Sequence, residues 1–468
     1  MRTYNLFIQD NFVSQVLAAN KDPDVTDIRA DGIIKWTQDA IAQGDNRWAW
    51  HGVNNPLPSD ATNAELDASK DLRFAGEGGT LELDRSVNLG AGKLQFSGDY
   101  QVKSSAGENY TWVGGGIEVD ADKTVGWQVN GLSGDTLHKI GAGTLHVNAS
   151  GVNGGALNVG DGLVILDQQA GKDGKKQAFS TITLVSGRPV VRLDSADQID
   201  PQKIQFDYRG GILDINGHDI SFSEIKHNDN GAKIVNRSTQ AATISLTGEK
   251  QVFLGTLGEE NNKNTLAIRY APSTTNEGWT LRGGAWADRL DVTQGTLALA
   301  GEQVRHAGDV YFSDDWLEKN YRISSVNIAD NSALTVKEHA TLTGDILMGK
   351  NAVLNLWDHA TLAGKLVLKE ADSFLKADIT ERTSIMGATA SRLSADVSGA
   401  GKIVKTGAGM LTVSGNVSNE PGIEVNEGQL QVTGNITGPV NMGKSTLLSG
   451  DGYISNLNLN DSAGGGQR

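Results

Sequence analysis

A twenty-residue unit between residues 325 and 364 restricts the fold more than any other feature of this sequence. It occurs twice, and the second copy repeats the first at an offset of 20 with no slippage. Asn331, Leu334, His339, Ala340, Thr341, Leu342 and Gly344 become Asn351, Leu354, His359, Ala360, Thr361, Leu362 and Gly364. The aliphatic pair at 326 and 328 returns at 346 and 348 and again at 366 and 368, so a third copy begins where the second ends.

Short apolar pairs within each copy indicate β-strands. Val326 and Ile328 form one pair, and two more follow at 334/336 and 340/342. A spacing of two residues places both side chains on the same face of a strand. Three such strands make a coil that can bury its apolar face only against the next coil, and no helical pattern intervenes. We therefore expect an all-β fold, a three-sided parallel β-helix with about 20 residues per coil.

A second signature extends this pattern beyond the repeat. The signature is glycine, one residue, leucine, one further residue and then an aliphatic or aromatic residue, and it indicates a turn followed by a strand with two inward side chains. It occurs at 79–83, 92–96, 143–147, 155–159, 211–215, 295–299, 409–413 and 428–432. The spacing between these sites is irregular before residue 325, so we expect loops of varying length there.

Composition and charge exclude several classes of partner. The chain has 58 glycines and only 8 prolines, as expected for many short strands joined by tight turns. The formal net charge is −15 and no basic run occurs, so nucleic acid and anionic membranes are poor partners. No apolar stretch is long enough to span a bilayer, and residues 1–20 lack the pattern of a signal peptide.

The chain contains no cysteine. This excludes a cysteine nucleophile, cysteine-ligated zinc and disulfide bonds. Disulfides are common in extracellular proteins, so a large secreted chain without them suggests export as an unfolded thread that a cross-link would block. A cytosolic protein that happens to lack cysteine is the alternative, which the solenoid pattern disfavours.

Three regions follow from the pattern of signatures. Residues 1–70 are the least regular, and we expect a cap or junction there, with short helices possible at 11–19 and 33–42. Residues 71–390 form the β-helix, in which 261–284 is the best candidate for a longer excursion. Residues 391–468 form glycine-rich terminal coils.

The possible site residues do not form a catalytic constellation. Ser133 and Ser449 lie in glycine-rich contexts that match no serine hydrolase motif, and turns explain both. No histidine pair has metal-binding spacing among His51, His138, His146, His218, His227, His306, His339 and His359. His339 and His359 stack one coil apart in the repeat, where a zinc pair is conceivable but a ladder of identical turn side chains fits better.

Acidic pairs and glycosylation sequons are also better explained by turns. The carboxylate pairs 120/122 and 314/315 could bind Ca²⁺ or act as acid and base, but solvated turns account for them. The segment 160–162 falls short of the calcium-binding nonapeptide. Sequons begin at Asn109, Asn148, Asn236, Asn416 and Asn435, a frequency that the composition explains. We therefore expect no catalytic, cofactor-binding or metal-binding residue.

Several runs carry a family resemblance. They are 137–147 (LHKIGAGTLHV), 155–168 (GALNVGDGLVILDQ), 177–180 (QAFS), 185–188 (VSGR), 206–217 (FDYRGGILDING) and 230–236 (NGAKIVN). Further matches are 71–74, 78–81, 306–307 and 314–316. Residues 71–330 resemble the passenger domains of serine protease autotransporters, the SPATE group and the related immunoglobulin A protease group. Residues 401–413 (GKIVKTGAGMLTV) resemble the strand repeat of autotransporters in general.

The resemblance implies a right-handed parallel β-helix, secreted to the surface or exterior of a Gram-negative bacterium through its own C-terminal barrel. It also implies a chymotrypsin-like protease domain at the N-terminus of the passenger. The motif Gly-Asp-Ser-Gly does not occur here, so no catalytic residue carries over. We therefore expect a fragment without the protease domain and the barrel: a stalk that is not itself an enzyme.

Three functions compete. The first is a monomeric extracellular stalk that presents the protease domain and aids secretion by folding. The second is an adhesin or self-association module whose side binds host proteins or glycans. The third is a β-helical polysaccharide-degrading enzyme, which needs a carboxylate cluster in a cleft. No such cluster is visible in the sequence, so the third ranks lowest.

Overall fold

The computed structural model describes residues 92–274, 278–304, 315–381 and 391–460 continuously. Outside these ranges it describes 26–29, 33–36, 47–48, 50–52, 66–67, 72–75, 78–83, 86–88 and 464–465. Strands dominate this part of the chain, and its helices are two short 3₁₀ segments, η2 (Pro201–Lys203) and η3 (Glu260–Thr265). The expected helix at 11–19 lies outside the described residues.

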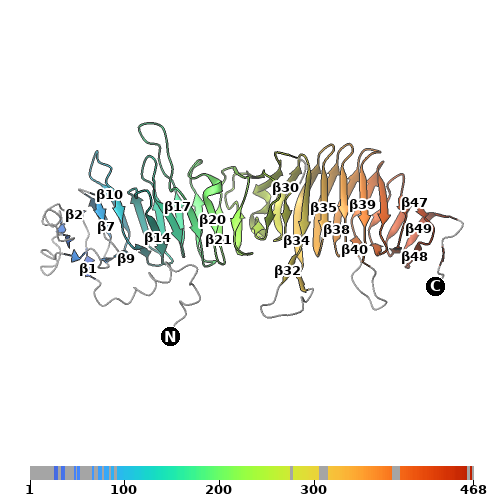
Figure 1. Ribbon diagram of the computed structural model, residues 1–468, viewed down its shortest axis with the longest axis horizontal. Helices are drawn as coiled ribbons and strands as arrows, with labels where there is room; N and C mark the ends of the chain where they lie inside the picture. The colour runs from blue at the N-terminus through green and yellow to red at the C-terminus, as the bar shows by residue number, and fades with distance from the viewer. Residues whose placement is uncertain are drawn as a thin grey trace. The chain divides into compact units, whose positions relative to one another are not determined.

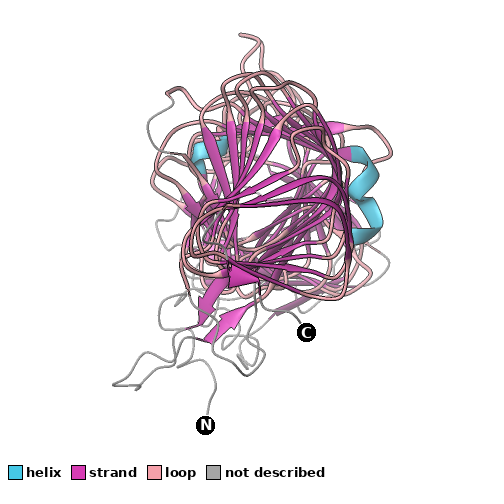
Figure 2. Cartoon of the chain, turned by 90° about the vertical axis from the view of Figure 1, so that its right-hand side faces the viewer, coloured by secondary structure: helices cyan, strands magenta, loops and turns pink. Residues whose placement is uncertain are grey.

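The chain divides into two compact units, and each is described separately. Unit 1 consists of Met1–His218 and Ile225–Lys233, and unit 2 of Asp219–Glu224 and Ile234–Arg468. In both units the strands pair in parallel with strands one coil away, so that they follow one another as stacked arrows (Figure 1). The loops lie at the corners between the sides (Figure 2). The expected all-β parallel β-helix is confirmed.

Three columns of buried side chains form the core of unit 2, one for each side of the coil. The first passes through β30 (Ala285–Val292), β34 (Lys319–Ile328), β36 (Ala340–Met348), β38 (Thr361–Leu368), β41 (Asp396–Gly399), β44 (Asn416–Val417) and β47 (Asn435–Met442). The second passes through β31 (Thr296–Ala300), β35 (Ala333–Lys337), β37 (Val353–Leu356), β39 (Phe374–Asp378), β42 (Lys402–Thr406) and β45 (Ile423–Val425). The third uses the first halves of β34, β36 and β38, then β40 (Ser391–Leu393), β43 (Met410–Val413) and β46 (Gln429–Val432).

The twenty-residue register predicted from the sequence is confirmed. Leu334 pairs with Leu354, and Leu342 pairs with Leu362, in parallel ladders. All four side chains are fully buried. The third copy continues the ladder, because Leu354 pairs with Leu375. Aliphatic side chains therefore stack on like side chains one coil away.

The third side of one coil and the first side of the next are joined without a loop. β36 and β38 each cover both sides and bend at Gly344 and Gly364. A Cβ at Gly344 would lie 2.0 Å from the carbonyl oxygen of Ile323, and one at Gly364 would lie 2.2 Å from that of Gly344. Glycine is required at this corner because the backbones of successive coils approach each other here.

Two long sides and one short side build unit 1. One side stacks β6 (Leu72–Ala75), β9 (Lys93–Phe96), β12 (Gly116–Val119), β14 (Thr136–Ile140), β16 (Ala156–Val159), β18 (Ile182–Leu184) and β20 (Ile204–Phe206). The other stacks β7 (Gly79–Leu83), β10 (Tyr100–Ser104), β13 (Thr124–Gln128), β15 (Thr144–Val147), β17 (Leu163–Leu166), β19 (Val190–Leu193) and β21 (Gly211–Asp214). The short side pairs β8 (Val87–Asn88) with β11 (Trp112–Val113).

Aromatic side chains fill part of this first core. The rings of Phe74 and Phe96 stack at 5.2 Å, and Tyr100 packs 5.4 Å from Phe96. Trp112 meets Trp127 edge to face at 5.5 Å. Such ring pairs stabilise a core beyond the area they bury.

The glycine signature predicted strands correctly at every site. Each signature contains a strand, and the inward pairs are fully or almost fully buried: Leu81 and Leu83, Leu94 and Phe96, Leu145 and Val147, Leu157 and Val159, Leu213 and Ile215, Leu297 and Leu299, Leu411 and Val413, and Leu430 and Val432.

Two local predictions were wrong. The helix expected at 33–42 begins as strand β2 (Ile33–Trp36), which pairs in parallel with β7 and antiparallel with β4 (Trp50–Gly52). The excursion expected at 261–284 contains β28 (Leu266–Tyr270), whose alternate residues are buried in the core. In both segments β-branched and aromatic residues favour strands, and pairing with a neighbouring coil decides the outcome.

An excursion occurs instead between β31 and β34. Here β32 (Glu302–Val304) pairs antiparallel with β33 (Asp315–Leu317).

None of the described helices has the length and apolar character needed to cross a membrane.

Candidate functional site

A buried lysine crosses from β14 to the next corner of unit 1. Lys139 is fully buried, and its Nζ donates hydrogen bonds to the carbonyl oxygens of Gly141 at 2.7 Å and Asp161 at 2.9 Å. Burial lowers the pKa of Lys139 to about 7, although the charges of Asp161 and Glu118 oppose this shift. The side chain therefore ties one coil to the corner of the next.

Lys405 repeats this arrangement in unit 2. Its Nζ donates to the carbonyl oxygens of Thr406 at 2.7 Å, Gly407 at 2.7 Å and Glu427 at 3.1 Å. Burial lowers its pKa to about 8, against the opposing charges of Asp378, Glu427 and Asp358. In both cases the distant acceptor lies 22 residues ahead of the lysine. We call these two arrangements the lysine cradles.

Sequence reasoning missed both lysines, although the signal was present. The segments at 139–143 and 405–409 share the pattern Lys-x-Gly-Ala-Gly, and each is followed 22 residues after the lysine by an acidic residue and glycine. Those glycines, Gly162 and Gly428, have φ angles of +72° and +73°. A Cβ on either would lie 2.4 Å from two carbonyl oxygens. The segment 160–162 is thus part of a cradle, and the Asp161 carboxylate accepts a hydrogen bond from the Gly162 backbone N–H at 2.8 Å and pairs with Arg188 at 3.1 Å.

An ion pair is buried near the first cradle. The Nζ of Lys93 on β9 lies 2.6 Å from Oε2 of Glu118 on β12, and both side chains are largely inaccessible to solvent. Two charges in a dry core require each other, because removing one leaves the other without a counterion. The pair therefore has a structural role in the core. An acid–base pair that acts on substrate needs access to solvent, and this pair is remote from it.

The stacked histidines of the repeat form a surface ladder. The rings of His339 and His359 are 4.8 Å apart with 6° between their planes, and Trp316 of the excursion stacks on His339 at 5.1 Å. His339 contacts Glu318 at 2.6 Å, and His359 contacts Glu381 at 2.5 Å. The ladder interpretation is therefore confirmed.

Metal binding was the alternative for this ladder. Over the described ranges, no group of three or more histidine, aspartate or glutamate side chains is arranged to hold a metal ion. A ladder of stacked rings holds the excursion strand β33 against the coil.

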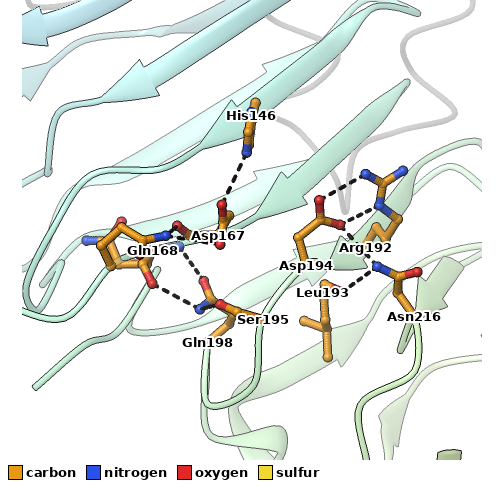
Figure 3. A network of polar contacts seen from close by, with 10 residues as sticks. His146, Asp167, Gln168, Arg192, Leu193, Asp194, Ser195, Gln198 and Asn216 are labelled. Carbon is orange, nitrogen blue, oxygen red and sulfur yellow. Dashed lines mark hydrogen bonds and ion pairs between the residues drawn. The ribbon is translucent and has the colours of Figure 1, made fainter. Parts of the chain in front are cut away.

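A polar network in unit 1 brings a serine, a histidine and aspartates into one neighbourhood (Figure 3). His146 Nε2 lies 3.7 Å from Asp167 Oδ2, which exceeds hydrogen-bond distance. The hydroxyl of Ser195 accepts a hydrogen bond from Gln198 at 2.7 Å. Arg192 pairs with Asp194 at 2.6 Å. The serine and the histidine are held by different partners, so these residues lack the relay of a serine protease triad.

The other sequence candidates lie at separate places. Ser133 is exposed at a turn, and Ser449 ends strand β48 (Leu447–Ser449), where it accepts a hydrogen bond from Gln429 at 3.0 Å. Asp122 adopts a left-handed φ of +61° at a turn. Asp314 and His306 lie outside the described residues.

Three of the five sequon asparagines make contacts that stabilise the coil corners. Asn416 donates to Asp396 at 3.0 Å and Asn435 donates to Asn416 at 3.0 Å, which forms a ladder along the corner. Asn236 is buried and donates to the carbonyl oxygens of Gln240 and Thr265. These contacts support the structural explanation of the sequons.

Comparisons with known proteins agree on one kind of protein. Residues 264–371 match the family described as the PIC/HAP1/IgA0 second beta-solenoid repeat region. The SepA serine protease autotransporter of Shigella flexneri is 43% identical over 242 residues, which cover 50% of this chain and 17% of that protein. The IgA-specific serine endopeptidase autotransporter of Neisseria gonorrhoeae is 45% identical over 230 residues, 48% of this chain and 14% of that protein.

A solved structure extends the likeness to almost the whole chain. The crystal structure of the Haemophilus influenzae Hap adhesin superimposes with a TM-score of 0.65 and 25% identity, over 96% of this chain and 61% of that one. The chain is an autotransporter passenger β-helix. The passenger domain of the plasmid-encoded toxin of enteroaggregative Escherichia coli, with a TM-score of 0.65 and 18% identity, shares the fold.

This passenger β-helix is homologous to the passengers of the SPATE group and of the Hap adhesin. It spans about a fifth of the length of the curated relatives that it matches. Those relatives are autotransporters of Gram-negative bacteria with secreted or surface passengers. Several of them are named as serine proteases.

Proposed function

We propose that this β-helix is an extracellular stalk that presents an N-terminal serine protease domain and promotes secretion by folding. The stacked ladders of unit 2 carry the proposal, because each coil is completed by the coil beside it and needs no distant segment. The names of the relatives support a protease in the whole protein. The β-helix itself contributes no nucleophile in this proposal.

The test uses the whole protein with a damaged coil. We expect Leu375→Asp in β39 to reduce the amount of passenger that is secreted, because a carboxylate replaces a fully buried side chain. Peptidase activity per secreted molecule should stay unchanged, and Lys376→Asp on the outward face should change neither quantity. If activity per molecule falls while secretion is normal, the β-helix belongs to the catalytic machinery and the stalk proposal fails.

The isolated chain provides a second test of the same proposal. We expect no casein cleavage and no labelling by a fluorophosphonate probe, since Ser133, Ser195 and Ser449 lack a base in hydrogen-bond contact in the described structure. Labelling of any serine would show that this segment is itself a hydrolase.

Adhesion is the second candidate function. A relative named adhesion and penetration protein autotransporter, from Haemophilus influenzae, is 35% identical over 322 residues, 60% of this chain and 23% of that protein. On this proposal the side of the β-helix binds host glycans, host proteins or another passenger. Binding of the purified chain to host cells, compared with its self-aggregation, tests it; failure of both would leave the stalk function unaffected.

A further inference from the structure

A groove with a volume of about 390 Å³ lies on one outer face of unit 2. Its wall is a column of outward side chains in register on successive coils, Arg269, Asp291, Asn327 and Leu347. Lys369 lies at the end opposite to Arg269. The four coil steps between these two cations correspond to about 19 Å at the usual strand spacing. The groove therefore suits an extended ligand with anionic groups at its two ends.

Small residues at the corner make the groove hollow. Ala329 follows strand β34 and Gly349 follows strand β36, at corresponding positions, and both residues line the groove. A Cβ at Gly349 would lie 2.9 Å from the backbone nitrogen of Asp330, so a larger side chain would crowd the corner. Leu347 adds an apolar surface, since 45% of it is exposed beside this hollow.

The charges lining the groove leave two cations for a ligand. Asp291 is already satisfied, because Arg289 Nε donates to it at 2.7 Å and Asn327 donates to it at 3.0 Å. The backbone of Arg269 pairs in the β-ladders, but within the part of the chain that the structure describes its side chain makes no ion pair or hydrogen bond. Lys369 lies 3.8 Å from Glu370, and both side chains are well exposed, so this pair contributes little.

The groove thus carries three cations and one carboxylate, a net charge of +2, on a chain whose net charge is −15. We propose that it binds a short acidic saccharide. Arg269 and Lys369 pair with carboxylate or sulfate groups near its ends. Asn327 and Leu347 contact the sugar rings between them, through the amide and through the apolar ring face. An extended saccharide suits a long, shallow, partly apolar groove better than a bare anion, which would use one cation only.

This proposal goes beyond the stalk function and does not depend on it. For the adhesin function proposed above, the groove supplies a binding site, and acidic saccharides are its class of ligand. Its test measures binding to the purified chain and the stalk test measures secretion, so the two proposals can fail separately.

The experiment is a calorimetric or NMR titration of the purified chain at low ionic strength. The probes are a hyaluronan tetrasaccharide, which carries carboxylates, and a chondroitin sulfate tetrasaccharide, which also carries sulfates. Neutral chitotetraose and a tetraglutamate peptide serve as ligand controls. We expect an acidic tetrasaccharide to bind with a Kd of about 1 mM or lower. Binding should weaken with added salt.

Matched variants locate the site. Arg269→Gln and Lys369→Gln should each weaken binding about tenfold, the usual effect of removing a charge-assisted contact. Arg392→Gln and Lys402→Gln remove exposed cations from other positions of unit 2 and should leave the Kd unchanged. Preference for one tetrasaccharide would identify the anionic group that the groove prefers.

Several results would overturn the proposal. One is binding of chitotetraose or tetraglutamate as tightly as the acidic tetrasaccharides. A second is no binding at about 10 mM ligand. A third is an equal loss of binding affinity in the control variants Arg392→Gln and Lys402→Gln. Wild-type affinity in both groove variants would also overturn it. All four positions are exposed, so these substitutions should preserve the fold, which the unfolding temperature of each variant checks.

Discussion

Lys139 and Lys405 show how a polar residue is accommodated in an aliphatic column. Each long side chain lies in the core and ends among backbone carbonyl oxygens of a corner. The inward leucines could be predicted from their spacing, whereas the shared Lys-x-Gly-Ala-Gly pattern was the one sequence signal for the lysines, because charge normally indicates an outward position. Only the geometry of the corner reveals that the Nζ can reach its acceptors.

The first cradle predicts a dependence of stability on pH. In the folded chain burial lowers the pKa of Lys139 to about 7, whereas an unfolded lysine keeps its proton until about pH 10.4. Between these values the unfolded state binds more protons. The stability of unit 1 should therefore rise with pH across this window, by up to about 1.4 kcal/mol per unit.

The measurement is thermal or denaturant unfolding at several pH values from about 6 to about 10. Lys139→Met should remove the rise that Lys139 contributes. Lys172→Met, a change at an exposed lysine of the same unit, should preserve it. An identical pH dependence in the wild type and in Lys139→Met would show that Lys139 keeps its proton when buried.

The corner glycine of the cradle gives a second prediction. Gly162→Ala combines a positive φ with a Cβ placed 2.4 Å from two carbonyl oxygens. Gly134→Ala has a similar φ of +88° but meets no atom within 4 Å. Backbone strain should cost about 1–2 kcal/mol in both variants, and the clash should add roughly 1–3 kcal/mol in Gly162→Ala only. Equal losses in the free energy of unfolding would mean that the corner relaxes freely.

At the scale of elements, the register of the repeat was predictable because its successive copies contain no insertions. Side chains at 334 and 354 pair as the offset requires. Strands β2 and β28 were harder to predict, because β2 lies in a segment without the glycine signature and β28 lies beside a polar, proline-containing stretch. A short strand is fixed by the neighbouring coil, and a single sequence does not show which coil that will be.

A pair of variants tests the inward and outward faces at β37 and the residue that follows it. Leu354 is fully buried, whereas Trp357 is 39% exposed and lies under the Nζ of Lys337 at 5.6 Å. Leu354→Asp should cost at least about 3 kcal/mol, because the carboxylate has no partner in the aliphatic column. Trp357→Asp should cost about 1 kcal/mol or less, the loss of a surface cation–π contact.

Hydrogen exchange or limited proteolysis separates the two variants. Leu354→Asp should open residues 330–380 and leave the strands of unit 1 protected, since a solenoid passes damage mainly to adjacent coils. Equal damage from both substitutions would contradict the assigned faces.

At the scale of the whole molecule, the sequence predicted the solenoid but neither the division into two units nor the groove. The division depends on contact density, which a single sequence does not show. The groove depends on side chains that lie up to 100 positions apart in sequence, from Arg269 to Lys369, and that come together only when the register of every coil between them is known.

Removing one whole coil tests the architecture. Deletion of residues 334–353 joins Ala333 to Leu354, so that Leu297 meets Leu354 in place of Leu334, and like side chains still stack. We expect the shortened chain to keep its strand content and cooperative unfolding, measured by circular dichroism. Deletion of 334–343 removes half a coil and should abolish both, because the corner residue Gly344 then takes the place of Leu334 opposite Leu297 and strands no longer meet strands. Comparable folding of both deletions would refute the fixed register.

The constant offset of the ladders also governs how fast such a chain can fold. In the repeat each residue pairs with one that is 20 positions away, whatever the total length of the chain. The entropic cost of closing the loop between them is therefore the same for every added coil, and the mean sequence separation of contacts does not grow as coils accumulate. Lengthening the β-helix adds steps to folding without making any single step harder.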